Sequence, residues 1–230
     1  MHVLGLIPAR GGSKGIPGKN LAEVAGRSLL AWTAAAAQAS ARLSRTVLST
    51  DDPTIAAAGR DLGLEVPFLR EPALAGDETP IVPVIADVLA RLAGIDGYAP
   101  DVVVLLQPTS PLRRAGDIDG AVDRLVESGA DTVVSIVEVP HQYNPASVLV
   151  EDGGVLSPWA GGTTVTRRQD KPRVFARNGP AVLALRPAVL VTGSLYGGVT
   201  RGFVMRPEDS VDIDTPWDLE LAGWLLGRRG

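Results

Sequence analysis

Apolar runs of strand length alternate with helix-length segments over the first 140 residues of this chain. Such runs are typical of parallel strands that are buried on both faces and joined by crossover helices. The alternation therefore predicts an α/β fold, with a Rossmann-like, mostly parallel sheet and helices on both of its faces. The expected strands cover residues 3–9, 45–49, 65–69, 101–106 and 132–137, and the expected helices cover 28–41, 53–62, 80–92 and 117–127.

Residues 138–180 break this alternation, because prolines and two glycine pairs interrupt short extended pieces there. We interpret this stretch as an excursion from the main sheet. The chain then returns with expected strands at 181–185 and 202–206 and a closing helix over 216–226. Chains tend to split into several domains only beyond about 250 to 300 residues. We therefore expect residues 1–230 to form a single domain, with 138–180 as an inserted arm.

Polar residues mark three of the predicted helix starts. Asp52 precedes Pro53, a favourable pair for the N-cap and the first helical position. Thr79 stands before the next predicted helix and is expected to cap it. Thr215 is followed by a proline and then by Asp218 at the third helical position, which predicts a capping box.

The composition excludes several kinds of site. The chain has no cysteine, and His2 and His141 are its two histidines, so any bound metal is expected to be a hard ion held by oxygen atoms. The net charge of −4 offers no general attraction to nucleic acid or anionic lipid. No apolar run approaches the roughly 18 residues that span a bilayer, and the N-terminus lacks a basic leader. We therefore expect a cytoplasmic protein without nucleic-acid or membrane partners, and we expect its four tryptophans to be packed.

A glycine-rich basic loop follows the first predicted strand. In open parallel sheets, ligands bind beyond the carboxyl ends of the strands. Glycines let backbone N–H groups converge on an anion, and cationic side chains neutralise its charge. The loop is not a Walker motif, because Ser13 precedes Lys14 and Pro17 stands where the helix would begin. Its position favours a di- or triphosphate site over a solvated basic turn. The candidate phosphate-binding residues are Arg10, Gly11, Gly12, Ser13, Lys14 and Lys19.

Asp212 and Asp214 form a second candidate site. In an extended segment, residues two apart point to the same side, so both carboxylates share one face while Ile213 enters the core. Two carboxylates, with phosphate oxygens and water, are the usual surroundings of Mg²⁺. The helix start at Thr215 has an acidic residue of its own, which leaves both aspartates free for a ligand. We therefore predict a magnesium site here rather than a purely structural role.

A polar loop follows the most hydrophobic of the predicted strands. Pro108 and Pro111 stiffen it, and Gln107, Thr109 and Ser110 offer polar groups that suit the hydroxyls and amides of a sugar. The alternative is an ordinary turn, since hydroxyl side chains are common in turns. The position at the carboxyl end of a strand favours a sugar-binding loop.

Five segments carry a family pattern, in the order 7–17 with 19–20, 49–52, 106–113, 167–170 with 178–179, and 212–215. Together they resemble the acylneuraminate cytidylyltransferases, the CMP-sialic acid synthetases of bacterial surface-sugar pathways. The resemblance implies transfer of CMP from CTP to the anomeric hydroxyl of a nine-carbon 2-keto sugar acid of sialic, legionaminic or pseudaminic type, with release of pyrophosphate. It also implies Mg²⁺ as cofactor and a homodimer, in which the arm at 138–180 completes the sugar site of the other subunit.

The resemblance also implies roles for individual residues. Arg10 and Lys19 would hold the triphosphate, with Lys19 close to the α-phosphate, and both would act in catalysis with Asp212. Asn20 would lie beside the nucleoside, and Arg70 would help to recognise cytosine. The remaining implied ligands are Thr79 on the nucleobase side, Asp212 and Asp214 for the metal, Gln107, Thr109, Ser110 and Asn178 for the sugar, and Arg168 for the sugar in trans.

Other readings stay open beside this one. Pro180 stands where the family usually has alanine, so the strand geometry next to it is expected to differ. A cytidylyltransferase for 3-deoxy-manno-octulosonate has the same fold, although its first loop normally reads Ser-Thr-Arg, and sugar-1-phosphate nucleotidyltransferases favour other glycine patterns. An alternative from a different class is a catalytically silent nucleotide-binding paralogue. The retention of Lys19, Gln107, Asp212 and Asp214 argues against a silent copy.

Overall fold

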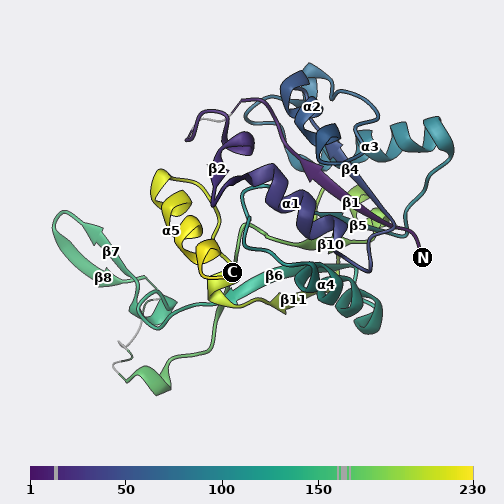
Figure 1. The fold of residues 1–230 in the computed structure, drawn as a ribbon. Helices are drawn as coiled ribbons and strands as arrows, with labels where there is room; N and C mark the ends of the chain where they lie inside the picture. The colour runs from purple at the N-terminus through teal and green to yellow at the C-terminus, as the bar shows by residue number, and fades with distance from the viewer. Residues whose placement is uncertain (13–14, 160, 162–164, 166, 230) are drawn as a thin grey trace.

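The computed structural model describes residues 1–12, 15–159, 161, 165 and 167–229. Within these residues a seven-stranded sheet forms the centre of the molecule (Figure 1). Six strands follow the order β11-β6-β10-β5-β1-β4, and β9 pairs with part of β6. The strands are β1 (Val3–Pro8), β4 (Arg45–Ser49), β5 (Val102–Leu105), β6 (Thr132–Glu138), β9 (Phe175–Arg177), β10 (Leu183–Leu185) and β11 (Thr200–Val204).

Five of the seven strands in this sheet run in the same direction, and β9 and β10 run in the opposite one. β1 pairs in parallel with β4 and with β5, and β6 pairs in parallel with β11. β10 lies antiparallel between β5 and β6. Its direction follows from its connection, because the chain reaches β10 from a segment that leaves the sheet after β6 rather than from a crossover helix. The predicted α/β fold with a mostly parallel sheet is confirmed.

Helices cover both faces of the sheet. Successive residues of a strand point to opposite faces, and in β1 Val3 and Ile7 enter one hydrophobic cluster while Leu4 and Leu6 enter another. α1, α2 and α4 pack on the first cluster, and α3 packs on the second. The helices are α1 (Leu29–Gln38), α2 (Pro53–Asp61), α3 (Ile81–Asp96), α4 (Ala115–Ser128) and α5 (Pro216–Gly227). In the described part of the chain, no helix is long and apolar enough to span a membrane.

A third, smaller hydrophobic cluster anchors α5 and two of the loops predicted to carry function. Its buried members include Ala222 of α5, Leu112 of the loop after β5, and Ile213. Ile213 is fully buried and lies between Asp212 and Asp214, as the sequence predicts. The core therefore fixes the backbone from which both carboxylates project.

Two of the predicted helix caps are confirmed and one is wrong. The Asp52 side chain accepts backbone N–H groups at the start of α2, and Thr215 and Asp218 form a reciprocal capping box at the start of α5. Thr79 does not cap α3, because Pro80 holds the N-cap position and no side chain bonds to the helix start. Thr79 thus stands one residue too early for the cap.

The strand predicted at 65–69 is absent from the described sheet. A single parallel bridge joins Glu65 to Val47 of β4, and no strand follows it. Pro67 lacks the N–H group that would continue the ladder, which explains why pairing stops after one residue. β4 is therefore an edge strand of the described sheet.

Residues 139–174 leave the sheet and project away from it (Figure 1). Within them β7 (Leu149–Asp152) and β8 (Val155–Pro158) form a separate antiparallel hairpin. The side chains of Val155 and Leu156 are 69% and 62% exposed. The hairpin therefore presents apolar side chains that nothing within the described chain covers.

The expectation that all tryptophans are packed is wrong for three of the four. Trp159, Trp217 and Trp224 are each more than half exposed. Trp32 is partly buried and donates its Nε1–H to the carbonyl of Val24 at 2.9 Å. Indole rings on the surface mark places that bind other molecules more often than isolated aliphatic residues do.

Candidate active site

The carboxyl ends of β1 and β5 border a cavity of about 470 Å³. Four stretches that are far apart in the sequence meet there: the loop after β1, the region that leads into α3, the loop after β5 and the segment before α5. The predicted site residues that line this cavity are Arg10, Lys19, Asn20, Arg70, Thr79, Gln107, Thr109 and Asp214. The structure thus brings together members of the predicted phosphate, sugar and metal groups.

Backbone contacts fix the loop that follows β1. Gly11 donates its N–H to Oδ1 of Asp51 at 3.1 Å, and Asn20 donates from Nδ2 to the carbonyl of Arg10 at 2.9 Å. A Cβ atom at Gly11 would lie 2.7 Å from Oδ2 of Asp52, so glycine is needed beside that carboxylate. Asn20 is buried, and its hydrogen bond to the carbonyl of Arg10 holds the loop in place.

Gly12 and Gly15 of this loop differ in their surroundings, since a Cβ atom at Gly15 would lie 2.8 Å from the backbone oxygen of Asp214. A Cβ atom at Gly12 would meet no other atom within 4 Å. Gly18 takes a left-handed conformation, with φ of 61°, immediately before the short helix Lys19–Leu21. Ser13 and Lys14 were also predicted to bind phosphate, and they lie outside the described residues.

Two cations at the cavity are already paired with carboxylates. Arg10 forms an ion pair with Asp77, and Nζ of Lys19 lies 3.1 Å from Oδ1 of Asp214. The Lys19 side chain is only 14% exposed, whereas the Asp214 side chain is 76% exposed. All four residues line the same cavity, so a bound polyphosphate would compete with the two carboxylates for the two cations.

Arg70 is buried at the end of β4. It donates to Oγ and to the carbonyl oxygen of Ser49, at 3.1 and 2.5 Å. Burial lowers the pKa of Arg70, and the charge of Asp51 opposes this effect. The guanidinium group is therefore held in one position at the cavity wall, where Thr79 also lies.

The loop after β5 depends on Arg113, for which the sequence suggested no role. Its guanidinium group donates from Nη1 to the carbonyl oxygens of Gln107 and Ala181, at 3.1 and 2.7 Å. Full burial lowers the pKa of Arg113 to about 10. Arg113 thus ties the loop to the strand region that follows Gly179, and Gln107 and Thr109 line the cavity as a result.

Ser110 lies behind this loop rather than in the cavity wall. It is buried, and its hydroxyl has no hydrogen-bond partner among the described residues. A Cβ atom at Gly179 would lie 3.1 Å from Oγ of Ser110 and 3.4 Å from Cγ of Asp212. The predicted sugar contact at Ser110 is therefore placed next to Asp212, in a tight space that glycine keeps open.

Asp212 and Asp214 have different surroundings. The N–H of Ile213 donates to the carbonyl of Thr109 at 2.8 Å, which ties this segment to the loop after β5. Burial raises the pKa of Asp212, the charge of Asp214 adds to the rise, and a hydrogen bond from Thr109 opposes it. Asp214 is exposed and carries the ion pair with Lys19.

The two carboxylates fit a divalent cation. Oδ1 of Asp212 is buried and has no hydrogen-bond partner in the described part of the chain, so an acceptor oxygen is available beside Asp214. The described residues contain no group of three or more histidines, cysteines or acidic side chains that could hold a metal alone. Hard cations accept phosphate and water oxygens as further ligands. A metal here would therefore be shared with a bound phosphate.

Asn178 supports the site from the core. It is buried, its Nδ2 donates to Oγ of Ser210 at 2.9 Å, and its Oδ1 accepts from Oγ of Ser135 at 2.6 Å. These bonds connect β6 with the segment that leads to Asp212. Asn178 was predicted to contact the sugar, but it does not line the cavity.

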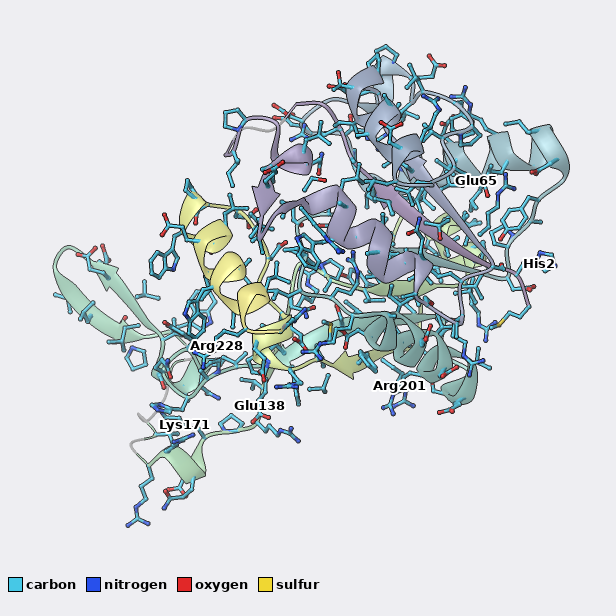
Figure 2. The ribbon with its side chains drawn as sticks, viewed as in Figure 1. His2, Glu65, Glu138, Lys171, Arg201 and Arg228 are labelled. Carbon is cyan, nitrogen blue, oxygen red and sulfur yellow. The ribbon has the colours of Figure 1, made fainter. Side chains whose placement is uncertain are left out.

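Arg168 lies apart from the cavity within this chain. It begins the short helix Arg168–Asp170 of the projecting segment, and it lines a different cavity of about 510 Å³ with His141 and Lys171. Figure 2 shows Lys171 in this projecting part and Glu138 at its base. The structure therefore does not bring Arg168 to the other predicted site residues of the same chain.

A family model described as Cytidylyltransferase matches residues 4–153. The chain is 32% identical over 227 residues to CMP-N,N'-diacetyllegionaminic acid synthase of Legionella pneumophila, which covers 98% of this chain and 97% of that protein. It is 33% identical over 230 residues to the synthase of the same name from Campylobacter jejuni, covering 99% of this chain and 96% of that protein.

Two further similarities widen this comparison. The chain is 32% identical over 232 residues to N-acylneuraminate cytidylyltransferase A of Danio rerio, and it spans about half of that protein's length, 52%. A solved CMP:2-keto-3-deoxy-manno-octonic acid synthetase complexed with CTP has a similar fold, with a TM-score of 0.75, full coverage of both chains and 18% identity. With the family match over most of its length and relatives above 30% identity, the chain belongs to the acylneuraminate cytidylyltransferase family of nucleotidyltransferases.

Proposed function

We propose that this enzyme transfers CMP from CTP to the anomeric hydroxyl of a nine-carbon 2-keto sugar acid of sialic, legionaminic or pseudaminic type, with release of pyrophosphate and with Mg²⁺ as cofactor. The observation that carries the proposal is the meeting of Lys19, Gln107 and Asp214 at one cavity. These residues come from the loop after β1, the loop after β5 and the segment before α5. A phosphate-binding cation, a sugar-binding amide and a metal-binding carboxylate are the groups that this reaction needs.

The reaction joins the anomeric oxygen to the α-phosphorus and breaks the bond from that phosphorus to pyrophosphate. In this proposal Arg10 and Lys19 neutralise the triphosphate, with Lys19 beside the α-phosphate. Mg²⁺, when bound, adds positive charge at the phosphates, and Asp212 and Asp214 would hold it. In this proposal the anomeric proton goes to Asp212, directly or through a water molecule.

The ion pair between Lys19 and Asp214 has to open during substrate binding. Its two partners lie 3.1 Å apart without a ligand, and the proposed roles send Lys19 to a phosphate and Asp214 to a cation. The nucleotide would draw Lys19 away from this ion pair, and the metal would draw Asp214 away from it. We infer that the two bind together, because either ligand alone leaves one charged group at the cavity without its partner.

The nucleotide and sugar parts would occupy opposite walls of the cavity. Arg70 and Thr79 line the wall near α3, which suits the cytosine base, and Asn20 lies beside the loop that would hold the phosphates. Gln107 and Thr109 line the wall formed by the loop after β5, which suits the sugar acid. Both sugar-facing groups are uncharged hydrogen-bonding groups that match hydroxyls and amides.

We further propose a homodimer in which residues 138–180 reach the sugar site of the other subunit. Two features support it: the apolar hairpin β7–β8 is exposed in the single chain, and Arg168 is remote from the cavity of its own chain. A charged residue such as Arg168 can bind the carboxylate of a sugar acid. Leu156→Glu is expected to convert the dimer to a monomer in analytical ultracentrifugation, and an unchanged mass would contradict the hairpin interface.

The eight-carbon substrate of a 3-deoxy-manno-octulosonate enzyme is the alternative. The solved synthetase for that sugar shares only 18% identity with this chain, so its likeness concerns the fold. Two relatives above 30% identity that cover nearly all of this chain are named for legionaminic acid, and a third is named for N-acylneuraminate. The nine-carbon class is therefore favoured.

Release of pyrophosphate from CTP tests the proposal directly. The enzyme is incubated with CTP, Mg²⁺ and, in turn, sialic, legionaminic, pseudaminic and 3-deoxy-manno-octulosonic acids, and pyrophosphate is measured. We expect turnover with at least one nine-carbon acid and much slower turnover with the eight-carbon acid. The reverse order of rates would support the alternative, and tight CTP binding without turnover of any acid would contradict the proposed function.

A further inference from the structure

A third cavity, of about 310 Å³, lies beside the end of α5 and shares no lining residue with the candidate active site or with the cavity at Arg168. Its walls come from the start of α4, from the segment around the short helix Pro207–Asp209, and from the last turn of α5 and the residues after it. We call it the arginine cavity, because four of its lining residues are Arg114, Arg206, Arg228 and Arg229, beside Glu208, Trp224 and Leu225.

Positive charge exceeds negative charge at this cavity. Arg206 pairs with Glu208, and Arg114 and Arg229 share the single carboxylate of Asp209. Arg228 forms no ion pair with any residue that the structure describes. Four guanidinium groups therefore stand against the carboxylates of Glu208, Asp209 and the nearby Asp117, which leaves an excess of positive charge in a chain whose net charge is −4. Such a local excess of like charge is unfavourable unless an anion balances it.

The shared carboxylate lies in a buried position. Asp209 is 2% exposed, and Nη2 of Arg114 lies 3.2 Å from its Oδ1. Burial lowers the pKa of Arg229, and the positive charge of Arg114 lowers it further, against the effect of Asp209. The two arginines thus repel each other across one carboxylate, and a second anion would relieve this repulsion.

Trp224 gives the cavity an aromatic wall. Its side chain is 58% exposed, and the guanidinium carbon of Arg228 lies 4.7 Å from its ring centroid. The partial negative charge at the end of a helix attracts cations, which accounts for Arg228 and Arg229. It does not account for Arg114 and Arg206, which reach the same cavity from other elements.

We propose that the arginine cavity binds a compact anion that carries phosphate groups. Guanidinium groups bind phosphate through paired N–H donors, and they are more weakly hydrated than ammonium groups. The cavity volume lies at the lower end of the range for small-molecule sites, roughly 300 to 1,000 Å³. Inorganic pyrophosphate and a nucleoside monophosphate share the required chemistry, and the second could also stack on Trp224.

The arginine cavity is connected to the candidate active site through Asp209. An anion that binds Arg114 and Arg229 competes with this carboxylate for its two partners. Asp209 lies three residues before Asp212 in the chain, and Arg114 directly follows the loop after β5. Binding in the arginine cavity therefore acts on the loop after β5 and on the segment before α5, both of which line the candidate site. The bound anion would thus be a regulatory ligand.

Titration calorimetry with inorganic pyrophosphate tests this site. The starting protein is Lys19→Ala, which weakens anion binding at the candidate active site, and Arg206 and Arg228 are then both replaced by methionine. We expect this double change to weaken the remaining binding by about 100-fold or more, because two charged hydrogen bonds to the anion are lost. Arg201→Met removes the same charge from an exposed position away from Arg228 (Figure 2), and it should leave the affinity unchanged.

Two further variants separate an anion site from a merely structural arginine cluster. Trp224→Phe should abolish a pyrophosphate-dependent change in tryptophan fluorescence while the calorimetric affinity stays. Asp209→Asn should raise the affinity for pyrophosphate severalfold, because it removes the competing carboxylate, whereas loss of structure would lower it. Thermal melting checks that each variant is folded.

The same titration with CMP identifies the ligand class. Tighter binding of CMP than of pyrophosphate would favour a nucleotide, and the reverse order would favour an inorganic anion. Equal affinity of either probe for Lys19→Ala and for the variant that also lacks Arg206 and Arg228 would overturn the proposal, as would a lower affinity in folded Asp209→Asn. These binding measurements need no turnover, so their outcome is independent of the proposed reaction.

Discussion

The candidate active site and the projecting segment at residues 139–174 use their side chains in opposite ways. At the site, polar groups are fixed from behind: Arg113 holds the loop after β5 by two carbonyl groups, and Ile213 anchors the two aspartates in a hydrophobic cluster. In the projecting segment the hairpin turns apolar side chains outward. The difference teaches that the described chain organises the cavity by itself, whereas it leaves the apolar side chains of the hairpin uncovered.

Core and hairpin leucines should differ most in their effect on stability. Leu105 in β5 is 1% exposed and Leu156 in β8 is 62% exposed. We expect Leu105→Ala to lower the free energy of unfolding by about 2 to 5 kcal/mol, because it leaves a cavity in the core. Leu156→Ala should change the stability of the isolated subunit by less than about 0.5 kcal/mol. Urea denaturation at low protein concentration measures both, and equal losses would contradict the contrast between the two regions.

Asp214→Ala should reduce kcat by about 100-fold or more, because it removes one of the two carboxylates proposed to hold the metal. The fold should be intact, since the Asp214 side chain is 76% exposed. Glu127→Ala in α4 is the matched control, as it removes an exposed carboxylate that does not line the cavity. Steady-state kinetics over a range of Mg²⁺ concentrations gives the comparison, and near-normal activity of Asp214→Ala would refute the metal assignment.

Lys19→Ala should lower kcat by about tenfold or more, because a cation next to the reacting phosphate is lost. Arg201→Ala removes an exposed cation of β11 that does not line the cavity, and it should leave kcat unchanged. Kinetics with CTP and with the sugar acid varied separately distinguish the two variants. An effect of Lys19→Ala that is confined to the KM of the sugar acid would count against its proposed place at the α-phosphate.

Asp212→Asn should stabilise the metal-free protein near neutral pH. This change in stability is the smallest of the effects expected here. Burial raises the pKa of Asp212 above its ordinary value of 3.8. As the pH rises through that value, the unfolded chain loses this proton first, so ionisation of Asp212 costs the folded state stability. The gain from asparagine should therefore be present above the raised pKa and vanish below pH 3.8. Thermal melting of the unchanged protein and of Asp212→Asn, from below pH 3.8 to neutral pH, measures this gain. A lower melting temperature of Asp212→Asn near neutral pH would contradict the prediction.

The sequence predicts those features that depend on neighbouring residues. The apolar run at Val102–Leu105 is a buried strand, and the caps at Asp52 and Thr215 need only residues within one helical turn. The strand at 65–69 fails because Pro67 interrupts the backbone ladder, and Thr79 fails as a cap because Pro80 takes that position. A local sequence pattern therefore predicts strands and caps correctly where no neighbouring residue, such as a proline, interferes with them.

The features that the sequence missed depend on distant partners. Arg113 bonds to a carbonyl 68 residues away, Arg10 pairs with Asp77 across 67 residues, and Arg114 reaches Asp209 across 95 residues. The sequence holds one sign of the role of Arg113: this charged residue directly follows the apolar Leu112 in the loop after β5. The choice of partner is decided by the packing of the sheet, which no local pattern encodes.

The antiparallel strand β10 has an evolutionary consequence. The projecting segment begins after β6 and returns through β9 and β10, and β10 is paired on both sides within the centre of the sheet. Strand pairing thus holds both ends of the segment in the sheet. Its tip can therefore gain, lose or exchange residues without moving the strands that carry the candidate site. If this segment contacts the sugar acid as proposed, its replacement would change the acceptor substrate while the nucleotide-binding part of the chain stays the same.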